Sequence, residues 1–239
     1  MNLSRRLAAE GIGSLFLAAT VVGSGIMAER IAGGNAAVAL LANTGATVAV
    51  LAVLIALFAP VSGAHFNPAV TLVQAIRGEM TWHEAIAYGS VQIVACCAGA
   101  LLAHAMFELP LIQHSLHARA GPAQCLSEGV ATFGLLLVIL GCRRTEDAPW
   151  MVAGWIGAAY WFTASTSFAN PAITIARSLS DTFAGIRPQD APAFILSQVV
   201  GAMAAYFVAR RLFSLQAPRN RLRNNDARTN GALHAQVHD

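Results

Sequence analysis

The 239-residue sequence contains no lysine, and all 15 of its basic residues are arginine. Charged residues make up only 11% of the chain, whereas 56% of it is hydrophobic and the mean hydropathy is +0.57. A soluble domain of this size rarely has so little charge. The composition therefore argues against a soluble protein and favours a helical protein that crosses a membrane several times.

Cysteine is also scarce, and the four cysteines have none of the spacings typical of a zinc site. Cys96 and Cys97 lie in an apolar run and are interpreted as small buried residues. We therefore expect no bound metal and no cofactor. Arg5 and Arg6 precede the first apolar run without a clear cleavage site. This pattern favours a retained first helix over a signal peptide.

Six apolar runs are each close to the ~20 residues that cross a bilayer. They lie at 7–27, 36–58, 84–107, 123–142, 149–166 and 191–213. Two shorter segments, 67–76 and 170–180, span only about half of the hydrocarbon core at ~1.5 Å per residue. Each half of the chain is thus predicted to contain two helices, a half-helix and a further helix. Because each half has three full spans, the two halves must have opposite topology.

One tripeptide occurs in both halves, as Asn67, Pro68 and Ala69 and again as Asn170, Pro171 and Ala172. Asn is a strong helix N-cap and Pro is favoured at the first helical position, so each copy predicts the start of a helix. Matching helix starts in two membrane-embedded halves predict half-helices that meet at mid-membrane. This arrangement marks the binding site in inverted-repeat transporters, and it serves a channel equally well.

A carboxylate also recurs, as Glu10 and Glu128, at the first helix of each half. A carboxylate within an apolar run is costly and usually has a partner. Loops that enter a half-helix have backbone N–H groups that must be satisfied inside the membrane. We expect Glu10 and Glu128 to be buried acceptors for those groups, the alternative being that both face water at the interface. For His65 we expect a structural hydrogen bond near the inner vestibule.

These residues resemble the aquaporin, or major intrinsic protein, family. The resemblance covers about 1–213 and rests on both motifs, the segment 62–71, the paired glutamates and the six-plus-two helix layout. It implies an all-α membrane protein with six transmembrane helices and two half-helices, a pore in each protomer and a homotetramer. Repeat one would cover about 7–107 and repeat two about 123–213. A polar cytoplasmic tail, 214–239, is expected to be disordered.

The physics of such a pore centre fits this resemblance. Two half-helix N-termini, each equivalent to about half a positive charge, repel cations and protons but not neutral molecules. The amides of Asn67 and Asn170 would donate hydrogen bonds to a passing water and interrupt a proton wire. Backbone carbonyls of 63–65 and 166–168 would supply acceptors. The alternative role for each Asn is a plain helix cap, and the two roles are compatible.

The chain departs from the family at the position directly after the second motif, where most water and glycerol channels have Arg. Here that residue is Ile173, and Arg177 follows one helical turn later. We expect Arg177 to line a wider outer mouth, or to pair with Asp181 at i+4, rather than to form a tight filter.

The remaining filter positions are predicted by counting back from the motifs without gaps. The count gives Thr47, Ala158 and Ser167, and an error of up to one turn keeps three further candidates open, Asn43, Tyr160 and Trp161. Together with Ile173, the counted residues predict a wide, partly polar and cation-free constriction. Such a constriction argues against strict selectivity for water.

The expected function is a passive channel for water and small neutral solutes that excludes protons and ions. The solutes would be glycerol-like polyols and, in a permissive pore, undissociated metalloid hydroxides such as arsenite. The alternative is an inverted-repeat secondary transporter, which would need ionisable residues in its spans to couple an ion. Apart from the two glutamates, the spans are almost free of them. An enzyme is not indicated, because neither His65 nor His104 with Glu108 has the spacing of a catalytic or metal site. Nothing supports nucleic-acid binding.

Arginine placement predicts the orientation in the membrane. With the N-terminus in the cytoplasm, four arginines lie outside, at positions 30, 119, 177 and 187. Eleven lie inside, at positions 5, 6, 77, 143, 144, 210, 211, 219, 221, 223 and 228. We therefore expect an integral multi-pass protein of a bacterial inner membrane, surrounded by lipid and with both termini cytoplasmic.

Overall fold

The computed structural model describes residues 2–213, which form eight α-helices and no strand. The six longer helices are α1 (Leu3–Ile31), α2 (Ala36–Ser62), α4 (Trp82–Met106), α5 (Pro122–Gly141), α6 (Ala148–Phe162) and α8 (Ala191–Leu212). The two short helices are α3 (Pro68–Ile76) and α7 (Pro171–Arg177). This order confirms the predicted layout of six helices and two half-helices. The expected disordered tail, 214–239, lies outside the described residues.

Both half-helices begin where the repeated tripeptide predicts. Asn67 and Asn170 have extended backbone, and a proline occupies the first helical turn after each of them. The Oδ1 atom of Asn67 accepts a hydrogen bond from the backbone N–H of Ala69, and that of Asn170 accepts one from Ala172, both at 2.9 Å. Each Asn side chain therefore satisfies a helix-terminal donor that has no intrahelical partner.

The two halves of the bundle are α1–α4 and α5–α8, and each is held by a close helix pair. In the first pair, a Cβ added to Gly99 of α4 would lie 2.3 Å from the carbonyl oxygen of Leu15 on α1. In the second pair, a Cβ added to Gly201 of α8 would lie 2.2 Å from the carbonyl oxygen of Gly129 on α5. Glycine at these positions lets the backbones approach, as is common between helices packed in membranes.

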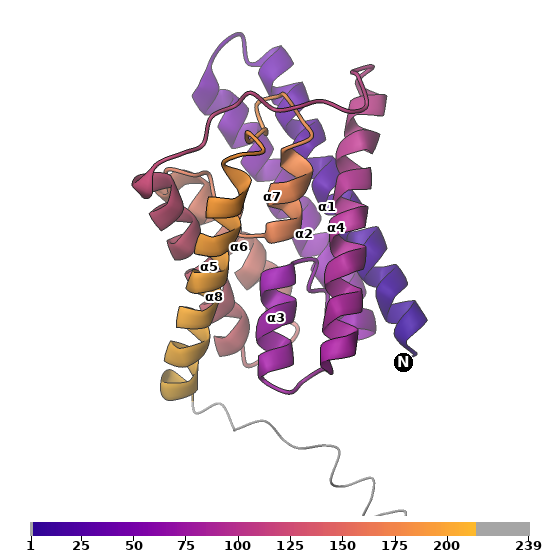
Figure 1. Ribbon diagram of the computed structural model, residues 1–239, viewed down its shortest axis with the longest axis vertical. Helices are drawn as coiled ribbons and strands as arrows, with labels where there is room; N and C mark the ends of the chain where they lie inside the picture. Colours follow the sequence, from indigo (N-terminus) through magenta and orange to yellow (C-terminus); the bar gives the residue numbers. More distant parts are fainter. Residues whose placement is uncertain (1, 214–239) are drawn as a thin grey trace, which may run out of the picture.

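Figure 1 shows how the halves are related: α3 and α7 enter the bundle from opposite sides, and their first turns approach each other between the longer helices. The beginning of α1 and the end of α8 lie on the same side of the molecule. The second half thus repeats the helix order of the first with opposite direction, which confirms the predicted inverted repeat.

The outer surface of the bundle is apolar, as expected for a protein surrounded by lipid. Five of the helices, α1, α2, α4, α5 and α8, are long and apolar enough to cross a membrane. Large apolar side chains face outward, among them Ile86 and Val94, each 69% exposed, whereas Glu10 and Glu128 are fully buried. The chain is therefore an integral multi-pass membrane protein.

Several helix ends differ from the predicted ranges. Helix α1 extends four residues beyond 7–27 at each end, and α2 continues to Ser62 rather than 58. Helix α6 ends at Phe162 and has 15 residues, whereas the apolar run continues to 166. Helix α7 ends at Arg177, three residues before the predicted end at 180. The predicted range for α6 was too long because it included residues 163–166, a mostly polar Thr-Ala-Ser-Thr stretch that belongs to the loop before the second motif.

Candidate functional site

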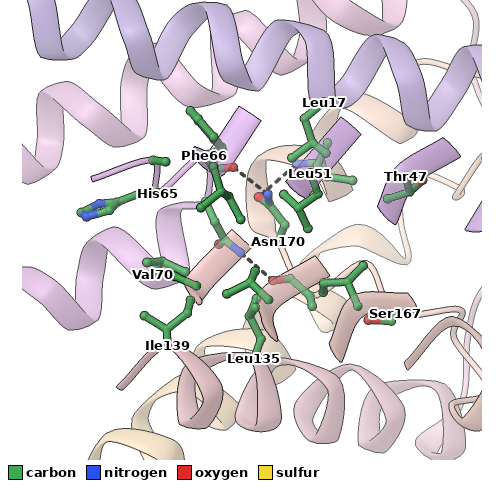
Figure 2. A pocket seen from close by; sticks show the side chains of 18 of the residues that line it. Leu17, Thr47, Leu51, His65, Phe66, Val70, Leu135, Ile139, Ser167 and Asn170 are labelled. Atoms are coloured by element: carbon green, nitrogen blue, oxygen red, sulfur yellow. Dashed lines mark hydrogen bonds between the residues drawn. The ribbon is translucent and has the colours of Figure 1, made fainter. Parts of the chain in front are cut away.

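A cavity of about 280 Å³ lies between the two halves and is lined by both motif asparagines. Its apolar walls consist of Leu17, Val21, Leu51, Ile55, Val70, Leu135, Ile139, Val152, Ile156 and Ile173. Figure 2 shows His65 toward one end, Thr47 and Ser167 toward the other, and Asn170 between them. We call these the Cys142 end and the Arg177 end, after two further lining residues.

The two asparagines are joined crosswise at the middle of the cavity (Figure 2). The Nδ2 atom of Asn67 donates to the carbonyl oxygen of Ala169, and that of Asn170 donates to the carbonyl oxygen of Phe66, both at 2.8 Å. A side-chain amide has two N–H donors and one oxygen acceptor. The oxygen caps the half-helix and one N–H holds the opposite loop. Each Asn therefore offers only its second N–H, a donor, to the cavity.

The loops before the motifs have matching strained conformations. Ala64 and Phe66 have φ values of 50° and 48°, and Ser167 and Ala169, at the equivalent positions of the second half, have values of 51° and 48°. L-residues rarely adopt this left-handed region, and holding them there costs of order 1–3 kcal/mol each. All four residues line the cavity. Surrounding contacts must therefore hold both loops in place.

Glu10 supplies those contacts in the first half. Its carboxylate accepts hydrogen bonds from the backbone N–H groups of His65 at 2.9 Å and Phe66 at 2.7 Å. The Ser62 hydroxyl donates to the same carboxylate at 2.6 Å, and the Gln92 amide does so at 2.7 Å. The structure therefore places Glu10 as a buried acceptor for the loop donors, and not at the water interface.

Glu128 has the same arrangement in the second half. Its carboxylate accepts from the backbone N–H groups of Phe168 and Ala169, both at 2.9 Å, and from the Gln198 amide at 2.6 Å. Gln198 also donates to the Thr174 hydroxyl at 2.9 Å. Gln92 makes the equivalent 3.1 Å bond to the Thr71 hydroxyl. Neither glutamine was predicted as a site residue, although each is a polar residue in an otherwise apolar helix of its half.

His65 occupies the Cys142 end of the cavity, where its Nδ1 atom lies 3.1 Å from the Thr71 hydroxyl oxygen. Its ring is stacked obliquely on Tyr88, with 5.4 Å between the ring centroids. These contacts give His65 the structural hydrogen bond that we expected. Within residues 2–213, no group of three His, Cys, Asp or Glu side chains is arranged to hold a metal ion.

The counted filter positions do not all line the cavity. Thr47, Ser167 and Ile173 line the cavity, whereas Ala158 is exposed on the outer surface of α6 and does not. Tyr160 lies there instead, with its hydroxyl oxygen 3.3 Å from that of Thr47. The prediction of Ala158 was wrong because a two-residue error turns a side chain by about 200° around a helix of 3.6 residues per turn.

The two other candidates do not line the cavity. Trp161 is 49% exposed. Asn43 is buried between α1 and α2, where its amide donates to the carbonyl oxygen of Val21 at 2.9 Å and to the Ser24 hydroxyl at 2.8 Å. Tyr160 is therefore the one alternative that the cavity supports.

Arg177 lines the cavity and is only 2% exposed. Its Nε atom donates to the carbonyl oxygen of Ala184, and its guanidinium carbon lies 3.3 Å from the centroid of the Phe168 ring. The alternative of a surface pair with Asp181 is wrong, because the Asp181 carboxylate accepts from the backbone N–H of Leu116 instead. Position 173 is thus apolar, and Arg177 lines the cavity one turn further along α7, in keeping with the first of its two expected roles.

Arg119, in the loop between α4 and α5, was not predicted at this site. Its Nε donates to the carbonyl oxygen of Gly185 at 2.8 Å, and its Nη1 donates to that of Ser165 at 3.1 Å. Its guanidinium carbon lies 5.0 Å from the centroid of the Phe168 ring. No local sequence pattern indicates this contact, because the partners are backbone carbonyls of distant loops.

Comparison with known proteins agrees with this geometry. The family profile described as Major intrinsic protein matches residues 1–149. The chain is 51% identical over 168 residues to an aquaglyceroporin, AqpS, from Rhizobium meliloti (strain 1021), which covers 70% of this chain and 72% of that protein. It is 33% identical over 169 residues to a probable aquaporin, AqpM, from Archaeoglobus fulgidus, covering 64% of this chain and 69% of the relative.

The fold is also similar to that of the aquaglyceroporin from Plasmodium falciparum. The TM-score is 0.66 at 16% sequence identity, over 89% of this chain and 97% of the other. The half-helices, the paired asparagines and the match over more than half of the sequence lead to one conclusion. The chain belongs to the major intrinsic protein family.

Proposed function

We propose that this protein is a passive channel for water and small neutral solutes of the size of glycerol. The observation that carries the proposal is the cavity between the half-helices, whose middle presents two N–H donors, from Asn67 and Asn170, and whose walls are otherwise largely apolar. The similarity to an aquaglyceroporin at 51% identity supports the same class of solute.

The asparagine pair explains how protons would be excluded. Because both Oδ1 atoms are used as helix caps, a water between the two amides meets only donors and must accept with its oxygen. Its own protons then point away from the centre toward the loop carbonyls, so a continuous proton wire is interrupted. The positive ends of the two half-helices act in the same direction and disfavour cations.

The lining also suits solutes that have both an apolar face and hydroxyl groups. Apolar side chains such as Leu51 and Leu135 face the cavity from one set of helices, while the loops 63–66 and 167–169 line it with backbone. A polyol could place its carbon chain against the former and its hydroxyls against the latter. Undissociated arsenous acid is a small neutral trihydroxide of the same kind, and we include it among the proposed solutes.

The carboxylates of the spans favour a channel over a secondary transporter. Ion-coupled transport uses ionisable groups along the path. Glu10 and Glu128 instead hold backbone N–H groups and glutamine amides, and neither lines the cavity. Among the described residues, no carboxylate lines the cavity.

The family resemblance further supports a homotetramer with one pore in each protomer. Among residues 2–213, arginine is more frequent on the side where α1 begins and α8 ends, which supports cytoplasmic termini. In that orientation the Arg177 end of the cavity would face outward.

Stopped-flow light scattering on proteoliposomes tests the proposal. Purified protein should accelerate the flux of water and of glycerol above that of empty liposomes, with no ion gradient imposed. Urea and arsenous acid, measured in the same vesicles, define how permissive the pore is. A solute flux that appears only when a proton or sodium gradient is applied would overturn the channel in favour of a transporter.

A further inference from the structure

Two arginines flank one aromatic ring at the Arg177 end of the cavity. The guanidinium carbons of Arg177 and Arg119 lie 3.3 Å and 5.0 Å from the centroid of the Phe168 ring. Both side chains are buried, with 2% and 8% exposure. Burial lowers the pKa of Arg119 to about 10, which still leaves it charged at neutral pH. Arg177 thus places one positive charge in the lining of this end, and Arg119, which does not line the cavity, places a second buried charge beside the same ring.

Neither guanidinium contacts a carboxylate among residues 2–213. Arg119 donates only to the backbone carbonyls of Gly185, Ser165 and Phe183 and to the Thr166 hydroxyl. Arg177 donates from Nε to a carbonyl, and its Nη1 has no hydrogen-bond partner. A buried charge is normally paired. Dipoles and a ring contact these two directly, and the buried carboxylate of Glu128, which accepts from the backbone N–H of Phe168, is an opposite charge that acts on both without touching them.

Three further acidic residues, Asp190, Asp181 and Glu29, bind other partners. Asp190 pairs with Arg187 at 3.0 Å and accepts from the backbone N–H of Arg119. Asp181 accepts from the backbone N–H of Leu116, and Glu29 accepts from that of Phe183. These carboxylates hold the loops of the mouth in place, and none of them makes a side-chain contact with Arg119 or Arg177.

A second buried polar atom without a partner belongs to another residue that lines this end. Ser167 is 2% exposed and lines the cavity, and its Oγ atom makes no hydrogen bond within the described residues. The hydroxyls of Tyr160 and Thr47 line the same end. An unpartnered guanidinium N–H and an unpartnered hydroxyl, on two residues that line the same cavity, are the kinds of donor that a small oxyanion requires.

We propose that the Arg177 end of the cavity binds a small monovalent oxyanion, held by Arg177 and Ser167, and that the bound anion obstructs the solute path. The obstruction rests on the proposed channel function, whereas the binding does not. The anion stays at the mouth because Ile173 and the apolar walls beyond it offer no partner that would replace its hydration. The ligand must be small because the entire cavity is only about 280 Å³.

Nitrate is a suitable probe, because it is planar, monovalent and ionised at any neutral pH. The first experiment measures the Tm of the full chain in detergent, in sodium nitrate against sodium gluconate at equal ionic strength. A ligand that binds the folded state raises the Tm with its concentration. We expect nitrate to give a saturable rise for the wild type. The absence of any rise specific to nitrate would overturn the proposal.

Variants separate this site from general salt effects. Arg177→Gln should abolish the nitrate-dependent rise, judged against the variant's own Tm in gluconate. The matched control is Arg30→Gln, because Arg30 also stacks on a phenylalanine, Phe107 at 5.1 Å, and donates to a carbonyl, but does not line the cavity. It should keep the full rise. A rise that survives in Arg177→Gln would overturn the site. If that variant does not fold, Ser167→Ala should weaken nitrate binding several-fold, and unchanged binding would count against the proposal.

The second experiment measures glycerol flux in proteoliposomes with nitrate or gluconate outside. We expect nitrate to reduce the flux of the wild type and of Arg30→Gln, but not that of Arg177→Gln. A nitrate current through the protein would show that the anion passes the pore, and it would contradict the proposed obstruction. Should glycerol flux be absent altogether, the proposed channel function fails, and the Tm experiment still decides whether the anion binds.

Discussion

Asn67 and Asn170 each donate a hydrogen bond to the carbonyl of the residue just before the other, at 2.8 Å in both directions. This exchange fixes the two loops to each other at the middle of the cavity. It also leaves each amide with a single N–H for a passing molecule, because the Oδ1 atoms cap α3 and α7. Helix capping and solute binding therefore use different atoms of the same side chain.

Asn170→Asp tests this division of roles. The variant keeps an acceptor for the cap, but it loses both amide donors and adds a negative charge next to the carbonyl oxygen of Phe66. We expect weaker exclusion of protons and cations, measured as dissipation of a pH gradient in proteoliposomes. The matched control is Asn43→Asp, which loses an equally buried amide donor outside the cavity. Both variants should lose stability, but only Asn170→Asp should leak. Unchanged flux and exclusion in a folded Asn170→Asp would contradict the donor role.

Glu128→Ala should destabilise the protein strongly. The change leaves the backbone N–H groups of Phe168 and Ala169 without acceptors, at about 1–3 kcal/mol for each buried group. Glu10→Ala should have a similar effect on His65 and Phe66. The measurement is the Tm in detergent, with solute flux as a second readout.

Glu79→Gln is the control for this series, because Glu79 is 53% exposed in its side chain and makes only a 3.8 Å surface pair with Arg77. It should behave like the wild type. A Glu128→Ala protein that is as stable as this control would show that the loop donors are satisfied in another way.

Ile173→Arg should reduce glycerol flux more than water flux. The variant adds length and a second positive charge about one helical turn below Arg177, where the wild-type lining is apolar. Ile173→Met, which changes the shape of the side chain but adds neither charge nor much volume, is the control for altered shape and should have a small effect. The readout is the ratio of glycerol to water flux in the same vesicles.

Arg177→Ala provides the opposite change. Since Arg177 lines the cavity one turn beyond Ile173, its removal should widen the mouth and alter the ratio less than Ile173→Arg does. A large change in Arg177→Ala together with none in Ile173→Arg would mean that the displaced cation sets selectivity.

Much of the architecture was predictable because local sequence patterns determine it. The repeated tripeptide predicts both helix starts. The paired glutamates predict buried acceptors, because a carboxylate within an apolar run needs a partner. Tyr160 was among the open candidates, but it was not singled out. Counting along the chain without knowing where α6 ends does not show which residues of that helix face the cavity. Hydropathy locates a span but does not show which side of the helix faces the cavity.

Arg119 illustrates what sequence patterns do not contain. It is a single cation in an irregular loop, and its partners are the carbonyls of Ser165 and Gly185, which are 46 and 66 residues away. Backbone acceptors have no signature in the residue types that carry them. Gln92 and Gln198 differ in this respect, because their recurrence in apolar helices was visible and was overlooked.

Cys142 allows the most direct test that this cavity is the conduction path. It lines the Cys142 end, whereas Cys96, Cys97 and Cys125 do not line the cavity. A bulky cationic methanethiosulfonate reagent, present on both sides of proteoliposomes, forms a disulfide with the thiol that a reducing agent removes. Glycerol flux is measured before labelling, after labelling and after reduction, with mass spectrometry reporting which cysteine is modified.

We expect labelling to reduce the flux of the wild type several-fold, reduction to restore it, and Cys142→Ser to be unaffected by the reagent. Undiminished flux through a protein whose Cys142 is fully modified, or an equal block in Cys142→Ser, would contradict a path through this cavity.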